Sequence, residues 1–141
     1  MKLIKEMIDH KHVAYTLLRL IVGINLFGHG FIRLPKIEGF REWMVNLFEK
    51  SPLPSSMISV FATVLPFMEF AVGIALIFGI FTRYAASLGA LIICALIFGS
   101  CMIENWEMAG GQMVYGLMLF VLLFFSEYNK ISADQLFFSH R

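Results

Sequence analysis

The sequence predicts an all-α membrane protein: a four-transmembrane-helix bundle with a short interfacial amphipathic helix between the first two helices. Hydrophobic residues make up 59% of the chain and charged residues only 15%, whereas soluble domains carry about 25% charged residues. The apolar residues gather in four runs, and each is long enough for the roughly 20 helical residues that cross a bilayer. A chain of 141 residues then forms a single membrane domain, 1–141, without room for a separate soluble catalytic domain.

Length and hydropathy place the membrane spans at about 13–32, 57–80, 84–103 and 109–126. Three lysines precede the first span and give it the look of a signal peptide. The apolar run is too long for a signal peptide, however, and no small-residue cleavage site follows it. We therefore expect an uncleaved first helix.

The segment at about 37–50, between the first two spans, predicts a short amphipathic helix. Its apolar residues recur at helical spacing and its polar residues fall elsewhere on the turn; the apolar ones are Phe40, Trp43, Met44, Leu47 and Phe48. A proline precedes the segment, and a stretch rich in serine and proline ends it. We expect this helix to lie in the membrane interface as an anchor, with a lid over the outer mouth of the bundle as the alternative.

Lysine and arginine residues in the flanks predict the orientation of the bundle. The side that holds both termini carries Lys2, Lys5, Lys11, Arg83, Lys130 and Arg141. The opposite side carries Arg33, Lys36, Arg41 and Lys50. Because positive residues are retained on the cytoplasmic side, both termini are predicted to be cytoplasmic.

Two charged residues lie inside the predicted spans, where an unpaired charge costs about 2.5–3.5 kcal/mol on insertion scales. At a rise of about 1.5 Å per residue, Arg19 lies about 9 Å and Glu69 about 16 Å from the cytoplasmic ends of their spans. A long arginine side chain can cover the difference, so the sequence predicts a buried Arg19–Glu69 ion pair. Two interpretations remain open: a structural pair that fixes helix packing, or a proton-accepting carboxylate poised by arginine.

A second polar group is predicted at the outer mouth of the bundle. His29 and Arg33 project from one face of the first span, and Gln112 lies just inside the start of the fourth. These side chains can hydrogen-bond the carbonyl oxygens of a lipid-soluble quinone, and a histidine can exchange the proton that quinone reduction requires. Aromatic residues nearby would hold the ring: Phe27, Phe31 and Trp106. The alternative is that His29 bonds a backbone carbonyl and Gln112 caps a helix end.

Other chemistries find little support in the sequence. Cys94 and Cys101 lie about 10.5 Å apart along one helix, beyond the roughly 7 Å between Cα atoms that a disulfide spans. One histidine lies inside a span, so no haem is predicted, and neither a metal site nor a nucleotide-binding loop is expected. A net charge of +1 gives no indication of nucleic acid.

A set of motifs runs through the first two spans and the loop after them: Leu17-Leu18-Arg19-Leu20, Gly23, Phe27-Gly28-His29-Gly30, Arg33-Leu34, Gly39-Phe40, Leu65-Pro66, Glu69, Gly73, Gly79 and Thr82-Arg83-Tyr84-Ala85-Ala86. With the tail Ile131-Ser132-Ala133-Asp134, this set resembles the DoxX family of small bacterial membrane proteins. Arg33 stands where a lysine is common in the family. The resemblance implies a four-helix bundle in the bacterial inner membrane.

The resemblance also implies a link to quinone or thiol redox metabolism, since relatives include a subunit of thiosulfate:quinone oxidoreductase. Another relative belongs to a membrane redox complex with superoxide dismutase and a sulfurtransferase. The residues that carry over by position are Arg19, His29, Arg33, Glu69 and Arg83.

The leading hypothesis is a quinone-interacting subunit of a membrane redox or oxidative-stress system, in contact with lipid, with redox proteins and with further copies of itself. His29 and Glu69 are the candidate catalytic residues; His29, Arg33, Trp106 and Gln112 are the candidate quinone site. The first alternative is a non-catalytic scaffold that docks redox partners. The second is a small transporter with Glu69 as its ion or proton site.

Overall fold

The computed structural model describes residues 9–138, so Lys2, Lys5 and Arg141 of the orientation argument lie outside it. The element order is α2 (His10–Arg33), η1 (Leu34–Lys36), α3 (Ile37–Leu47), α4 (Ser55–Phe78), α5 (Thr82–Met102), α6 (Trp106–Phe124), η2 (Ser126–Tyr128) and α7 (Ala133–Phe138). Four helices in this part of the chain are long and apolar enough to cross a membrane. The predicted all-α fold and multi-pass membrane character are confirmed.

Each of the four long helices begins two or three residues before its predicted span. Polar N-terminal caps explain the extension of two of these helices. The Asp9 side chain accepts a hydrogen bond from the Lys11 backbone N–H at the start of α2, and Asn105 accepts one from Met108 at the start of α6. Such caps satisfy backbone donors that hydropathy alone does not count.

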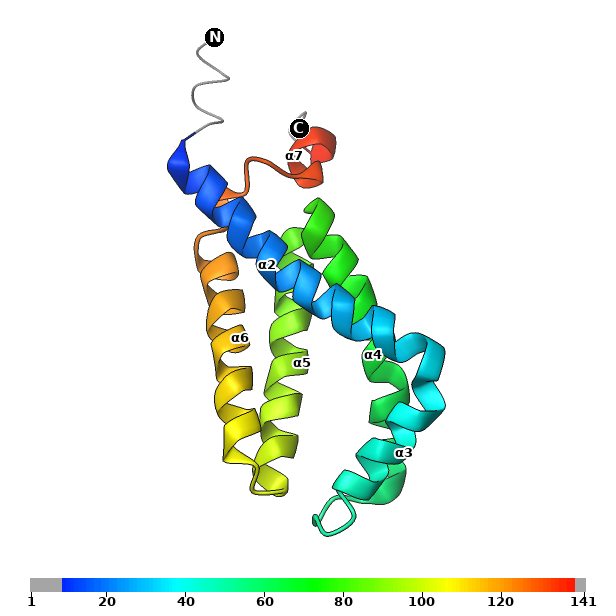
Figure 1. Ribbon diagram of the computed structural model, residues 1–141. Coiled ribbons are helices and arrows are strands. Elements are labelled where there is room, and N and C mark those ends of the chain that lie inside the picture. Colours follow the sequence, from blue (N-terminus) through cyan, green and yellow to red (C-terminus); the bar gives the residue numbers. More distant parts are fainter. Residues whose placement is uncertain (1–8, 139–141) are drawn as a thin grey trace.

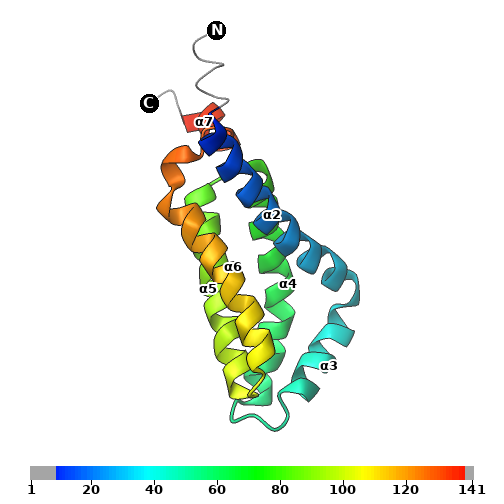
Figure 2. The ribbon, with the colours of Figure 1, turned by 60° about the vertical axis from the view of Figure 1, so that its left-hand side comes forward.

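The first span does not run straight through the bundle. Figure 1 and Figure 2 both show α2 crossing α4 obliquely and ending beside the middle of α4, where α3 continues toward the other end. The change of direction falls at Leu34–Lys36, a short 3₁₀ segment with Pro35 near its start. Because proline lacks a backbone N–H and clashes with the preceding turn, the α-helix of α2 ends here.

The amphipathic helix predicted at 37–50 is confirmed as α3, and its apolar side packs against α4. Met44 and Phe48 are buried there with Ile58 and Ala62. Both ribbon views place α3 alongside the N-terminal half of α4 (Figures 1 and 2). Its location at the membrane interface stays a prediction, but its apolar face now has a defined partner inside the protein.

Glycines bring α2 and α4 into close contact. A Cβ atom added at Gly23 would lie 2.9 Å from the backbone nitrogen of Ile77, and one at Gly73 would lie 2.6 Å from the Cα of Phe27. Small residues allow helix backbones to approach this closely in membranes. These contacts set the register of the two helices, and the register decides which polar side chains meet.

The segment after α6 closes the end of the bundle where α4 ends and α5 begins (Figure 1). Asp134 accepts hydrogen bonds from the backbone N–H groups of Phe81 at 2.6 Å and Thr82 at 2.9 Å. Its own N–H donates to the Gly79 carbonyl at 2.9 Å. A carboxylate at a helix N-terminus satisfies free backbone donors and complements the helix dipole.

Replacing Asp134 by alanine should lower the free energy of unfolding by about 1–2 kcal/mol, because α5 loses its N-terminal cap. Asp134→Asn keeps one acceptor oxygen and should cost less. Gln135→Ala is the matched control, since no side-chain hydrogen bond joins Gln135 to the described residues. Thermal unfolding of the full chain in mild detergent measures all three. Equal midpoints for wild type and Asp134→Ala would rule out this capping role.

Candidate functional site

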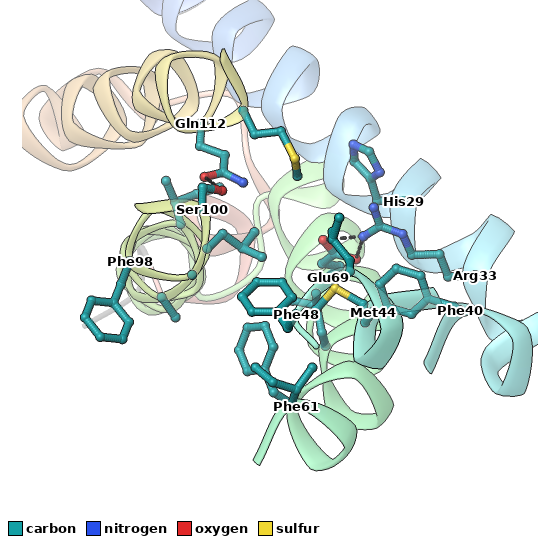
Figure 3. A pocket seen from close by; sticks show the side chains of 18 of the residues that line it. His29, Arg33, Phe40, Met44, Phe48, Phe61, Glu69, Phe98, Ser100 and Gln112 are labelled. Atoms are coloured by element: carbon teal, nitrogen blue, oxygen red, sulfur yellow. Dashed lines mark hydrogen bonds and ion pairs between the residues drawn. The ribbon is translucent and has the colours of Figure 1, made fainter. Parts of the chain in front are cut away.

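A cavity of about 630 Å³ lies between five helices of the bundle. Its wall combines residues of α2, α3 and α4 on one side with residues of α5 and α6 on the other (Figure 3). Small-molecule sites commonly have volumes of about 300–1,000 Å³ and largely apolar walls with a few polar groups. This cavity has that size and that kind of lining.

Arg33 and Glu69 form an ion pair in the cavity wall (Figure 3). Nη1 of Arg33 donates to both carboxylate oxygens of Glu69, at 2.9 and 2.7 Å. The Glu69 side chain is 3% exposed and that of Arg33 is 25% exposed. The guanidinium also lies over the Phe40 ring, 4.6 Å from its centroid, in a favourable cation–π contact. Two opposite charges thus cancel inside a largely apolar chamber.

The predicted Arg19–Glu69 ion pair is wrong, although both residues are buried as expected. Arg19 instead donates to the Asn129 side chain at 2.8 Å and to the Ile131 carbonyl at 2.9 Å. Asn129 in turn donates to the Thr82 hydroxyl at 3.0 Å. Arg19 therefore belongs to the polar contacts that hold the C-terminal segment against the bundle.

The error has a geometric cause. The depth estimate treated the first two spans as if both began and ended in the same two planes, whereas α2 crosses α4 obliquely (Figure 1). A Cβ at Gly30 would meet the Pro66 carbonyl and Phe70, and one at Gly79 would meet the Arg19 guanidinium. This register carries Arg19 beyond the end of α4 and brings Arg33 to Glu69.

His29 lies one helical turn before Arg33 and lines the same cavity, as predicted from their spacing. Gln112 also lines the cavity, on the α6 wall. There it accepts a 2.9 Å hydrogen bond from the hydroxyl of Ser100 on α5. Figure 3 shows Gln112 and Ser100 on one side of the chamber, and His29, Arg33 and Glu69 on the other. Three of the four residues predicted for the quinone site therefore share one cavity.

Trp106, the fourth, is not among the residues that line the cavity. It is the first residue of α6 and is 66% exposed. It lies six positions before Gln112, so at 3.6 residues per turn its side chain is rotated by about 240° around the helix axis relative to that of Gln112. Phe27 and Phe31 stack on each other, with ring centroids 5.5 Å apart, and also lie outside the lining. Phe27, Phe31 and Trp106 therefore do not line this cavity.

Other aromatic residues line the cavity, and the sequence analysis did not assign them to the site: Phe40, Trp43 and Phe48 from the α3 region, Phe61 from α4 and Phe98 from α5. The apolar stripe of the amphipathic segment was the available signal, since it contains the first three. Depth along the spans gave no indication that this stripe faces a cavity. Phe48 also closes over Gly99 of α5, where an added Cβ would lie 3.2 Å from the Phe48 ring.

Arg83, which the family resemblance singled out, is exposed near the start of α5 and does not line the cavity. Asn105 caps the N-terminus of α6. Asn25 and Tyr115 line the cavity and join α2 to α6 through a 3.4 Å hydrogen bond.

A bundle of four apolar helices, each long enough to span a membrane, around a cavity with an ion pair in its wall defines a small multi-pass membrane protein. Comparison with protein families matches residues 14–100 to DoxX, so the chain belongs to the DoxX family. The match covers α2 to α5 and most of the cavity wall, while α6 and the C-terminal segment follow it. Searches of curated proteins and of solved structures gave no match.

Proposed function

We propose that this DoxX-family protein is a quinone-binding subunit of a membrane redox or oxidative-stress system, placed in the bacterial inner membrane with both termini in the cytoplasm. The observation that carries the proposal is the cavity, which combines an aromatic lining with a polar wall at His29, Arg33 and Glu69. A lipid-soluble quinone has a flat apolar ring and carbonyl oxygens, so the two kinds of lining match its two parts. The electrons would come from a protein partner.

Arg33 is suited to hold a quinone carbonyl. Its Nη1 is occupied by Glu69, whereas no described residue accepts a hydrogen bond from its Nε or Nη2. Hydrogen bonds from a charged donor are roughly twice as strong as neutral ones. Glu69, itself buried, keeps the guanidinium in place and balances its charge. His29 has no hydrogen-bond partner among the described residues, so its imidazole is available to exchange a proton.

Tryptophan fluorescence offers a direct test, because the chain has two tryptophans and only Trp43 lines the cavity. In a Trp106→Phe variant, Trp43 is the single reporter. We expect a short-chain 1,4-naphthoquinone to quench its fluorescence saturably, because the ring enters the chamber beside it. Adding His29→Ala should weaken binding by roughly three- to tenfold, the value of one hydrogen bond.

Trp43→Phe provides the control, since the exposed Trp106 then reports only the partitioning of quinone into detergent. Quenching in that variant should rise without saturation. The proposal fails if Trp43 and Trp106 are quenched with the same concentration dependence.

The two alternatives gain no equally specific observation. A scaffold would dock its partners through the amphipathic segment and the C-terminal tail. The C-terminal segment, however, is bound within the molecule by Arg19 and by the Asp134 contacts. Glu69, the ion site in the transport hypothesis, is already neutralised by Arg33. Loss of partner proteins on changing residues 37–50 would support the scaffold, and flux abolished by Glu69→Gln would support transport.

A further inference from the structure

We propose that the cavity selects a ligand with hydrogen-bond acceptors on two opposite edges, as in a 1,4-dicarbonyl ring. Arg33 would bind one acceptor and Gln112 the other, and Ser100 would act as a positioning residue for Gln112. This inference rests on the proposed function and adds to it the pattern of carbonyl groups that the site recognises. It follows from which donors in the cavity are occupied and which are free.

On the α6 wall, the Gln112 side chain is held in one orientation. Its Oε1 accepts the Ser100 hydroxyl at 2.9 Å, and the Ser100 side chain is buried, with the residue 2% exposed. In a planar amide the oxygen and the NH₂ group project from the same carbon in different directions, so fixing the oxygen also fixes the direction of the NH₂ group. Figure 3 shows the Gln112 nitrogen turned away from Ser100, toward the side of the chamber that holds His29 and Arg33. No described residue accepts a hydrogen bond from it.

On the α2 wall, the free donors belong to Arg33. Glu69 occupies Nη1 through both of its oxygens and leaves Nε and Nη2 without acceptors among the described residues. Each wall therefore carries donors that have no acceptor among the described residues. These donors are not sealed within the protein, since none of them belongs to the described buried atoms that lack a partner. A ligand that supplies an acceptor to each wall can therefore form a hydrogen bond at both.

Aromatic rings also line the cavity. Figure 3 shows Phe48 and Phe61 in its wall, below Gln112 and Ser100 and to the left of Arg33. A flat ring fits such surroundings by stacking or edge contacts. A ring with one carbonyl satisfies a single wall, and it should choose Arg33 because charged donors bind more strongly.

The test uses the full-length Trp106→Phe protein in detergent, with Trp43 as the reporter. A short-chain 1,4-naphthoquinone is the first probe, and a 1-tetralone with the same chain is the second, measured by its displacement of the quinone. Gln112→Leu should raise the Kd of the quinone about tenfold, the loss of one well-placed hydrogen bond, and leave that of the tetralone unchanged. Ser100→Ala should raise the quinone Kd by a smaller factor with the same selectivity, because the amide remains but is less well oriented.

Thermal unfolding shows whether both variants remain folded. If Gln112→Leu does not fold, Ser100→Ala alone provides the test. The inference is overturned if the variants weaken both ligands equally, or neither. If Trp43 quenching is saturable but the variants show no such selectivity, the proposed quinone site stands and the two-sided recognition does not. Unsaturable quenching in the parent protein would overturn both proposals.

Discussion

Replacing Arg33 by methionine should destabilise the protein by about 3–5 kcal/mol, because it leaves the Glu69 carboxylate buried without its partner. Glu69→Leu should cost less, because the charge that it leaves unpaired is the less buried of the two: the Arg33 side chain is 25% exposed and that of Glu69 3%. The double variant Arg33→Met/Glu69→Leu should be more stable than Arg33→Met alone, because no unpaired charge remains. Unfolding free energies from detergent titrations in mixed micelles measure the resulting double-mutant cycle.

The same cycle with Arg19 serves as the control. Arg19 contacts Asn129 and Ile131 and makes no ion pair with Glu69. The effects of Arg19→Met and Glu69→Leu should therefore add to within about 0.5 kcal/mol, as expected for distant sites. Coupling between positions 19 and 69, with additivity between 33 and 69, would instead restore the pairing that depth along the spans predicts.

Local patterns in the sequence were enough to predict the helices. Hydrophobic runs gave the four spans to within two or three residues at their starts, and helical spacing gave α3. Spacing within one helix also placed His29 and Arg33 together, because residues four apart share a face. Gly23 and Gly30 lack side chains where α4 comes closest to α2, which is the role that small residues commonly have between membrane helices.

Relations between helices could not be predicted in the same way. The partner of Glu69 depends on the crossing angle and register of α2 against α4, and neither is encoded in the position of a residue along its own span. The lining of the cavity depends on the turn at Leu34–Lys36, which directs α3 back along α4. Trp106 illustrates the same limit. It lies near Gln112 in depth, but it projects from a different side of α6 and does not line the cavity.

The register of α2 and α4 can itself be tested at Gly73. A Cβ there would lie 2.6 Å from the Cα of Phe27, so the two backbones must separate before alanine fits. Overpacking of a tight core costs about 1–3 kcal/mol and occasionally more, and we expect Gly73→Ala to reach the upper part of that range. Unfolding in mixed micelles measures the loss.

Gly28, which follows Phe27 in α2, provides a matched control, because nothing lies within 4 Å of a Cβ added there. Gly28→Ala should be neutral or stabilise the helix by up to about 1 kcal/mol, since alanine loses less backbone freedom than glycine. Gly73→Ala should also weaken quinone quenching of Trp43, because moving α2 separates Arg33 from Glu69, whereas Gly28→Ala should leave it unchanged. Equal stability and equal quenching in the two variants would mean that α2 and α4 do not meet at Gly73, and that the ion pair does not depend on their contact.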